Sequence, residues 1–350
     1  MLLWNRHTCA LAASGLLFLA APAALADGPY HYIKEIPVGT DGGWDYLSID
    51  PAAHRLYVAH GNQVVVIDTA TDTVSGTIAD TPGVHGLAVA PQLNRGFVSD
   101  GRANKVSIVD LASLKPVGEA ATGTNPDCII FEPGRNEVYA FNGRSQSATV
   151  IGADSGKVVT TIPLPGKPEF AQADPAAGRV YDNLEDKSVV VAIDTRTHAV
   201  VAQWPVAPGE GPSGLALDAA HHRLFVGCDS VMVVLDSATG KVVGSVPVGE
   251  GVDAAAFDPG TGFAFTSNGE SGTVTVVHED SPDQFTVVQT LPTEKSARTM
   301  QVDPASHKIY LASAKFEAPA APPAGGGRPP RPKMIPGSFK ILVYGLAPGA

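Results

Sequence analysis

Short apolar segments separated by turn residues recur along almost the whole chain. In the first unit, four such segments cover residues 46–50, 55–60, 63–68 and 73–78, and Val, Ile and Leu dominate their apolar positions. The tetrapeptides PAAH and TATD between them are rich in turn-forming residues. No stretch shows a convincing apolar period of 3.6 residues, so the pattern predicts many short β-strands and few helices.

Two markers repeat with this pattern. The fifth residue of the first segment recurs at intervals of 40 to 45 residues, at Asp50, Ala90, Glu132, Asp174, Asp218, Asp258 and Asp303. A marker at the end of the third segment recurs every 42 residues, at Asp68, Asp110, Gly152, Asp194, Asp236 and His278. A repeat of this length built from short strands is typical of a β-propeller with one blade per repeat. The chain is therefore predicted to be an all-β, seven-bladed β-propeller with four-stranded blades.

The two ends of the chain predict how the ring closes. The last unit stops after three strand segments, whereas the first unit is preceded by an unassigned segment, IKEIPVG at 33–39. This segment resembles KVVGSVPVG at 241–249, which is a fourth strand elsewhere in the repeat. We therefore expect the N-terminal strand to complete the last blade and leave no open edge.

The last unit also carries 24 extra residues, 314–337, between its second and third strands. Pro and Gly dominate this insertion, and its charged residues include Arg328, Arg331 and Lys333. Such a composition cannot bury a core and predicts a partly polyproline loop. Its cations suggest a lid or partner-docking segment over the carboxylates described below, and a surface insertion without a role is the alternative.

Residues 1–26 have the features of a secretory signal peptide. Arg6 precedes an apolar run over 11–25, and Ala24-Leu25-Ala26 forms a cleavage site before Asp27. Residues 27–350 are then expected to form one propeller domain that is periplasmic or secreted. No later segment approaches the ~18 apolar residues of a membrane-spanning helix, so no membrane span is predicted.

Charge narrows the class of partner. Loss of Arg6 with the signal peptide leaves 23 basic residues against 35 acidic ones, a net charge of −12. Nucleic-acid binding needs a surface that neutralises phosphates, so nucleic acid is an unlikely partner for this acidic chain. The remaining classes of partner are a small-molecule ligand and an exported protein.

The second strand segments carry a family resemblance. They read LYVAH (56–60), GFVSD (96–100), VYAFN (138–142), LFVGC (224–228), AFTSN (264–268) and IYLAS (309–313). With the 42-residue spacing and the V-I-D strands that follow, they resemble the YVTN-repeat, YncE-like β-propellers. This resemblance implies an exported seven-bladed propeller and is specific for fold rather than function. DNA binding is associated with a member of that family, but the charge of this chain does not support it here.

The repeat register also selects candidate site residues. The residue five before each first marker should occupy the same place in every blade, where the first strand enters the channel. These positions hold Asp45, His85, Asp127, Glu169, Ser213, Asp253 and Arg298. Four carboxylates around one axis would repel one another, and a cation or positively charged ligand would relieve this. The alternative is a polar lining of a water-filled channel mouth.

The loops between second and third strands should lie on the same face. They add Asn142 and Asn268 as candidate ligand-binding residues, although Asn is also a common turn residue. Two histidines, His60 and His85, fall on this face beside Asp45 and Asp100. Imidazole and carboxylate groups suit a divalent transition metal, so these four residues form a candidate metal site, and hydrogen-bonded histidines are the alternative.

Two classes of function follow. The first is an exported propeller that binds a small ligand, a cation or a protein partner at the channel mouth. The alternative is a metal-assisted hydrolase or lyase, similar to lactonases, that uses the same face. No pair of nucleophile and base is recognisable in the sequence, so binding is the preferred hypothesis. The sequence leaves the cofactor unknown, and a divalent metal is the candidate.

Overall fold

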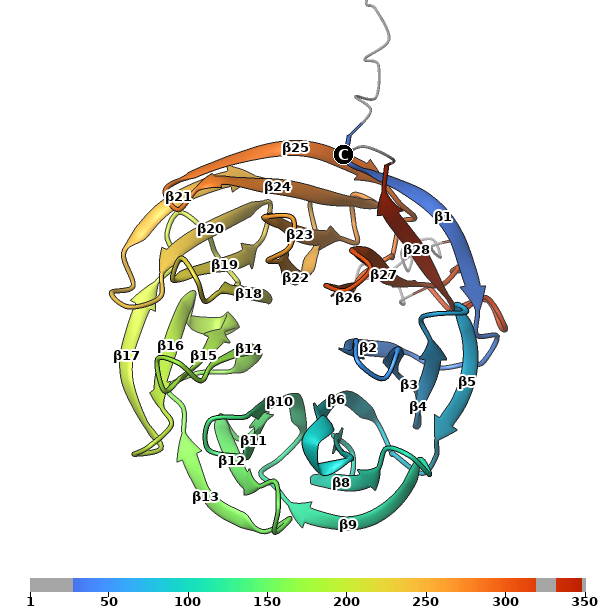
Figure 1. Ribbon diagram of the computed structural model, residues 1–350, viewed down its shortest axis with the longest axis vertical. Helices are drawn as coiled ribbons and strands as arrows, with labels where there is room; N and C mark the ends of the chain where they lie inside the picture. Colours follow the sequence, from blue (N-terminus) through green and yellow to red (C-terminus); the bar gives the residue numbers. More distant parts are fainter. Residues whose placement is uncertain (1–27, 319–331, 348–350) are drawn as a thin grey trace, which may run out of the picture.

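The computed structural model describes residues 28–318 and 332–347. These residues form seven antiparallel sheets of four strands each, arranged as blades around a central channel (Figure 1). The predicted seven-bladed β-propeller is thus confirmed. The proposed signal peptide and residues 319–331 of the insertion lie outside the described residues. Within the described part of the chain, no helix has the length and apolar character needed to cross a bilayer.

The blades follow one another in chain order, and each runs outward from the channel. Their strands are, for blade 1, β2 (Trp44–Asp50), β3 (Arg55–His60), β4 (Gln63–Asp68) and β5 (Thr73–Ile78); for blade 2, β6 (Val84–Ala90), β7 (Arg95–Asp100), β8 (Lys105–Asp110) and β9 (Lys115–Ala121); for blade 3, β10 (Pro126–Glu132), β11 (Glu137–Asn142), β12 (Ser147–Gly152) and β13 (Val158–Pro163); for blade 4, β14 (Pro168–Asp174), β15 (Arg179–Leu184), β16 (Val189–Asp194) and β17 (Ala199–Pro205). The remaining strands are, for blade 5, β18 (Gly214–Asp218), β19 (Arg223–Cys228), β20 (Val231–Asp236) and β21 (Val242–Pro247); for blade 6, β22 (Val252–Asp258), β23 (Phe263–Asn268), β24 (Thr273–Ser281) and β25 (Gln284–Pro292); for blade 7, β26 (Met300–Asp303), β27 (Lys308–Ser313), β28 (Lys340–Leu346) and β1 (Tyr30–Pro37). Two 3₁₀ turns, η1 (Pro91–Leu93) and η2 (Glu185–Lys187), complete the described elements.

The repeating carboxylates stabilise the turns that join the strands. Asp50 Oδ1 accepts a hydrogen bond from the backbone N–H of Ala53 at 3.1 Å, and Asp174 Oδ1 accepts one from Ala177 at 3.0 Å. Asp194 does the same for the turn between the third and fourth strands, where the N–H of Thr197 donates at 2.9 Å. The first marker of blade 2 is Ala90, which has no such acceptor, and the 3₁₀ turn η1 follows it instead. The aspartate markers therefore recur because their carboxylates accept hydrogen bonds from the turns that follow them.

An aromatic ring from the second strand of every blade anchors the core. This third position of the strand is at most 1% exposed in all seven blades, where it holds Tyr57, Phe97, Tyr139, Tyr181, Phe225, Phe265 and Tyr310. The buried apolar residues group into clusters that each join two neighbouring blades. Burying one such ring stabilises the fold by roughly 1.5–3 kcal/mol, so each blade depends on the blades beside it.

The N-terminal strand closes the ring as predicted. β1 pairs antiparallel with β28 from Tyr30 opposite Leu346 to Pro37 opposite Lys340. It is the outermost strand of blade 7 and lies beside β28 in Figure 1. The insertion leaves blade 7 between β27 and β28, also as predicted, and its two described ends meet in an antiparallel bridge between Phe316 and Met334.

Candidate functional site at the channel mouth

The predicted ring residues lie where the first strand of each blade begins. Asp45, His85, Asp127 and Glu169 are the second residues of β2, β6, β10 and β14. In all four strands the pairing register shifts immediately after the first residue, for example between Trp44 and Leu47. Such a β-bulge leaves residues unpaired and redirects their side chains. The same local irregularity therefore presents four ionisable side chains in four consecutive blades.

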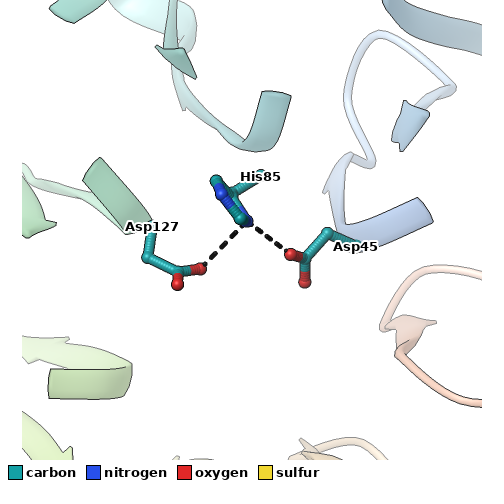
Figure 2. A group of neighbouring side chains, drawn as sticks. All are labelled: Asp45, His85 and Asp127. Carbon is teal, nitrogen blue, oxygen red and sulfur yellow. Dashed lines mark hydrogen bonds and ion pairs between the residues drawn. The ribbon is translucent and has the colours of Figure 1, made fainter. Parts of the chain in front are cut away.

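His85 lies between two carboxylates from the neighbouring blades (Figure 2). Its Nδ1 is 2.6 Å from Oδ2 of Asp45 and 3.3 Å from Oδ1 of Asp127. One ligand atom from each of the three residues falls within 4.8 Å of the other two. The side chains are only 14–26% exposed, so they are partly shielded and still reachable from solvent.

Burial and mutual charge shift the protonation of this group. Burial raises the pKa of Asp127 to about 7, and the charge of Asp45 adds to this effect. Burial also raises the pKa of Asp45, although the hydrogen bond with His85 opposes the rise. Burial disfavours the charged imidazole of His85, but the hydrogen bond to Asp45 and the charge of Asp127 outweigh it and raise its pKa to about 9. At neutral pH the His85 imidazolium therefore donates from Nδ1 to Asp45.

The other ring members extend the polar mouth. Arg298 Nη1 forms an ion pair with Asp253 Oδ2 of the neighbouring blade at 2.7 Å. Burial raises the pKa of Glu169 to about 7 and the charge of Asp127 contributes, while Lys167 opposes the rise from 2.9 Å. Ser213 is different, because its hydroxyl donates to the backbone carbonyl of Val252 at 2.6 Å.

Two aromatic side chains narrow the channel beside the ring. The Tyr46 hydroxyl donates across the channel to the backbone carbonyl of Glu169 at 2.7 Å. The rings of Tyr46 and Phe170 meet edge to face at 5.1 Å. A channel cavity of about 510 Å³ is lined by residues of the first strands, Tyr46 and Phe170 among them. The polar mouth therefore adjoins an aromatic constriction.

A second cavity lies beside Arg298, at the base of the insertion. It measures about 480 Å³ and is lined by Asp41, Gly42, Gly43, Trp44, Ser296, Arg298, Phe316, Met334 and Pro336. The guanidinium carbon of Arg298 is 5.4 Å from the centre of the Trp44 ring. Phe316 also packs against Trp44, with 6.1 Å between ring centres. The described ends of the insertion thus lie next to the ring, on the face where the sequence placed it.

Four residues predicted for this face are buried inside the blades instead. His60 stacks on Phe339 with ring centres 4.0 Å apart, and burial lowers its pKa. Asp100 accepts a hydrogen bond from the Ser107 hydroxyl at 2.5 Å, and burial raises its pKa to about 6. The amide groups of Asn142 and Asn268 donate to hydroxyl groups of the adjacent third strand. Of the predicted set His60, His85, Asp45 and Asp100, the structure brings only Asp45 and His85 together, and Asp127 lies beside them.

Two residues that sequence reasoning missed contribute to the electrostatics of the mouth. Lys167 precedes Glu169 by two residues and contacts both Glu169 and Glu185. Asp182 in β15 is fully buried and neither of its carboxylate oxygens has a hydrogen-bond partner among the described residues. Burial raises its pKa well above the usual value, and the charge of Glu169 adds to this. The sequence does contain a signal for Asp182, because it is a charged residue at a position that is uncharged in the other six blades. Those blades have Val58, Val98, Ala140, Val226, Thr266 and Leu311 there.

Comparisons with known proteins support the fold and give little information about the function. No family model matches the chain. Two bacterial proteins named "Uncharacterized protein YncE" are similar over 148 residues: that of Salmonella typhimurium is 26% identical and that of Salmonella typhi 25%. Each alignment covers 41% of this chain and 42% of the relative, so the chain matches about two fifths of the length of these curated relatives.

A solved structure agrees with the ring architecture. The hydrazine synthase chain of Kuenenia stuttgartiensis aligns with a TM-score of 0.68 over 84% of this chain and 95% of its own, at 16% identity. That level of identity supports a shared fold only. Together with the seven observed blades, it supports a seven-bladed β-propeller fold for this chain, which is similar to YncE over part of its length.

Proposed function

We propose that the protein is an exported propeller that binds a small cationic ligand at its channel mouth. The observation that carries this proposal is the placement of His85 between Asp45 and Asp127, with three ligand atoms within 4.8 Å of one another. Raised pKa values at Asp127 and Glu169 add support, because burial raises both and the charge of a neighbouring carboxylate adds to each rise. Perturbed carboxyl groups in a concave site are typical of functional sites.

The shared chemistry is a positive charge between the two carboxylates, and two kinds of ligand supply it. A divalent metal ion would be held by the Asp45 and Asp127 oxygens and the His85 nitrogen, a donor set that suits Zn²⁺. An organic ammonium group would be held by the carboxylates alone. The two differ in proton release, since a metal must displace the proton of His85 Nδ1 and an ammonium ion need not.

Binding of Zn²⁺ and of 1,4-diaminobutane to the chelator-treated full chain tests the proposal. Asp127→Asn removes one of the two carboxylates with little change of shape, and we expect it to weaken binding at least about tenfold. Asp100→Asn is the matched control, because Asp100 was a candidate from sequence but lies buried beside Ser107. Calorimetry in buffers of different ionisation enthalpy separates the two ligands by counting released protons. An equal affinity for 1,4-diaminobutane together with an equal number of bound Zn²⁺ ions in the parent and Asp127→Asn would refute the proposal.

Export is a separate part of the proposal. It rests on the apolar run at 11–25 and the cleavage site before Asp27. N-terminal sequencing of the protein recovered from the periplasm or medium should begin at Asp27. A cytoplasmic chain that retains Met1 would contradict it.

A second candidate function is metal-assisted hydrolysis or elimination at the same mouth. The pKa values of about 7 at Asp127 and Glu169 favour it, because a carboxyl group near neutral pKa can donate or accept a proton at physiological pH. Metal-dependent turnover of a panel of lactones, lost in Asp127→Asn and kept in Asp100→Asn, would support it. Ligand binding without turnover leaves the binding function as the proposal.

A further inference from the structure

A second group of metal-ligating side chains lies between blades 5 and 6, on the face opposite the mouth. Asp218 ends β18, His221 follows in the turn before β19, and Glu279 comes from β24. His221 Nδ1 lies 2.7 Å from Asp218 Oδ2 and 3.2 Å from Glu279 Oε1. One ligand atom from each residue falls within 4.8 Å of the others. The turns between first and second strands all lie on this face, so the group is distinct from the Asp45–His85–Asp127 site.

Glu279 is the unusual member of this group. Its equivalents in the other six blades are uncharged, namely Thr69, Leu111, Ala153, Thr195, Ser237 and Gly345. Its side chain is 2% exposed, and neither carboxylate oxygen accepts a hydrogen bond from the described residues. A buried carboxylate without hydrogen bonds is costly unless another charge compensates it.

The protein cations nearby provide that compensation only in part, because the lowering effects of His221 and Arg223 on the pKa of Glu279 are smaller than the rise from burial and from Asp218. Arg223 is the adjacent guanidinium, and its Nη1 pairs with Asp236 at 3.0 Å while its Nη2 pairs with Asp283 at 2.9 Å. His221 is a single imidazole facing two carboxylates. Asp218 uses Oδ1 to accept from the backbone N–H of Ala220 at 2.9 Å, which leaves its Oδ2 directed at the group. Burial and the Asp218 charge accordingly raise the pKa of Glu279 to about 7.

We propose that Asp218, His221 and Glu279 bind a divalent transition-metal ion that joins blades 5 and 6. One imidazole nitrogen and two carboxylate oxygens are a donor set found at Zn²⁺ sites, and the fourth position is open to water. The His221 side chain is 52% exposed while both carboxylates are buried, so the ion would enter from the solvent side. The β24–β25 hairpin supplies both Glu279 and Asp283. The ion pair between Asp283 and Arg223 holds Arg223 beside the site. This inference does not depend on the function proposed for the channel mouth.

The test uses the full chain, freed of metal by chelator, and Zn²⁺ or Co²⁺ as the probe. All variants are made in the Asp127→Asn background, so that the mouth does not contribute. We expect about one bound Zn²⁺ per chain after dialysis, and visible Co²⁺ absorption bands from coordination by nitrogen and oxygen. Glu279→Gln should weaken binding at least about tenfold and remove these bands.

Glu137→Gln is the matched control. Glu137 is also a buried carboxylate beside a histidine on this face, with His198 Nε2 at 2.9 Å, but it is not part of a three-residue group. His221→Ala is a second test variant, since its exposed side chain can be removed without opening the core. Zn²⁺ should raise the melting temperature of the background and of Glu137→Gln but not of the two test variants. Equal Zn²⁺ binding in Glu279→Gln and its background would overturn the inference, and so would a background that binds no Zn²⁺.

Discussion

Removing residues 28–40 should abolish cooperative folding or lower the melting temperature by more than ten degrees. These residues supply β1, which buries Tyr30 and Ile36 at 1% and 3% exposure. The Tyr30 ring meets Phe265 edge to face at 5.2 Å, and its backbone exchanges hydrogen bonds of 2.8 and 2.9 Å with the Gln289 side chain of blade 6. Burial of two large side chains is worth roughly 3–6 kcal/mol. That is a large share of the ~5–15 kcal/mol that holds a typical domain together.

Deletion also exposes β28 as an open edge, which invites association between chains. Calorimetry and size-exclusion chromatography would follow both effects. Two point variants give a matched pair within β1, because Tyr30 is buried and Tyr32 is 51% exposed. Tyr30→Ala should destabilise the ring by roughly 3–5 kcal/mol, and Tyr32→Ala by much less. A deleted chain that melts like the parent would mean that β1 does not close the ring in solution.

Two features made the fold predictable from sequence. The alternation of apolar segments and turn carboxylates repeats in register, and both have a local physical cause. Asp50 and Asp194 cap their own turns, so the markers occur wherever a turn of this type occurs. In blade 1 the last three strands have the predicted bounds, 55–60, 63–68 and 73–78, whereas β2 begins at Trp44 rather than Tyr46. That extension arises from the β-bulge, which pairs Trp44 with His60 and then skips to Leu47.

The same bulges limited what could be predicted of the site. Register counting placed Asp45, His85, Asp127 and Glu169 at equivalent positions, and the first strands of blades 1–4 all shift register immediately after their first residue. Register counting also placed His60 and Asp100 at the mouth, which was wrong. These residues end the second strands of their blades, and their side chains are buried. Counting residues along a strand cannot show which end residues leave the sheet and which remain covered.

The signals that sequence analysis missed were single residues that differ from their equivalents in the other blades. Asp182 and Glu279 each place a carboxylate where the other blades have uncharged residues. Both prove to be buried, with carboxylate oxygens that lack hydrogen-bond partners among the described residues. Comparing the seven blades position by position would have found both. In a repeat protein, an ionisable residue at an otherwise uncharged core position is therefore a better pointer than a polar residue in a loop.

The stability of the ring should fall as pH rises from about 4 to 9. Asp127 and Glu169 have folded pKa values of about 7, raised chiefly by burial; the charge of Asp45 adds to the rise at Asp127, and the charge of Asp127 adds to the rise at Glu169. The unfolded chain therefore releases these protons at lower pH than the folded chain, and unfolding becomes progressively easier until pH exceeds about 7. His85, whose folded pKa is about 9, acts in the same direction. Its contribution is complete below its ordinary value of 6.5 and is lost as pH rises through 9.

Glu169→Gln isolates one part of this dependence. The rise in the pKa of Glu169 from 4.5 to about 7 corresponds to up to about 3 kcal/mol once both states are ionised. Unfolding by urea should therefore show the variant equal to the parent near pH 4 and more stable near pH 8. Glu35→Gln is the control, because Glu35 pairs with Lys340 in blade 7 and is not among the groups that shift the pKa of Glu169. Its pH profile should follow that of the parent.

The same experiment links stability to binding. If the raised pKa values result from carboxylates kept close for a cationic ligand, Zn²⁺ or 1,4-diaminobutane should restore stability to the parent near pH 8. The gain should be smaller near pH 4, where the carboxyl groups are protonated and attract the ligand less. A variant that is less stable than the parent near pH 8, or a difference that does not change with pH, would show that Lys167 already compensates Glu169. The mouth would then be a set of satisfied ion pairs, and the cationic-ligand proposal would lose its electrostatic support.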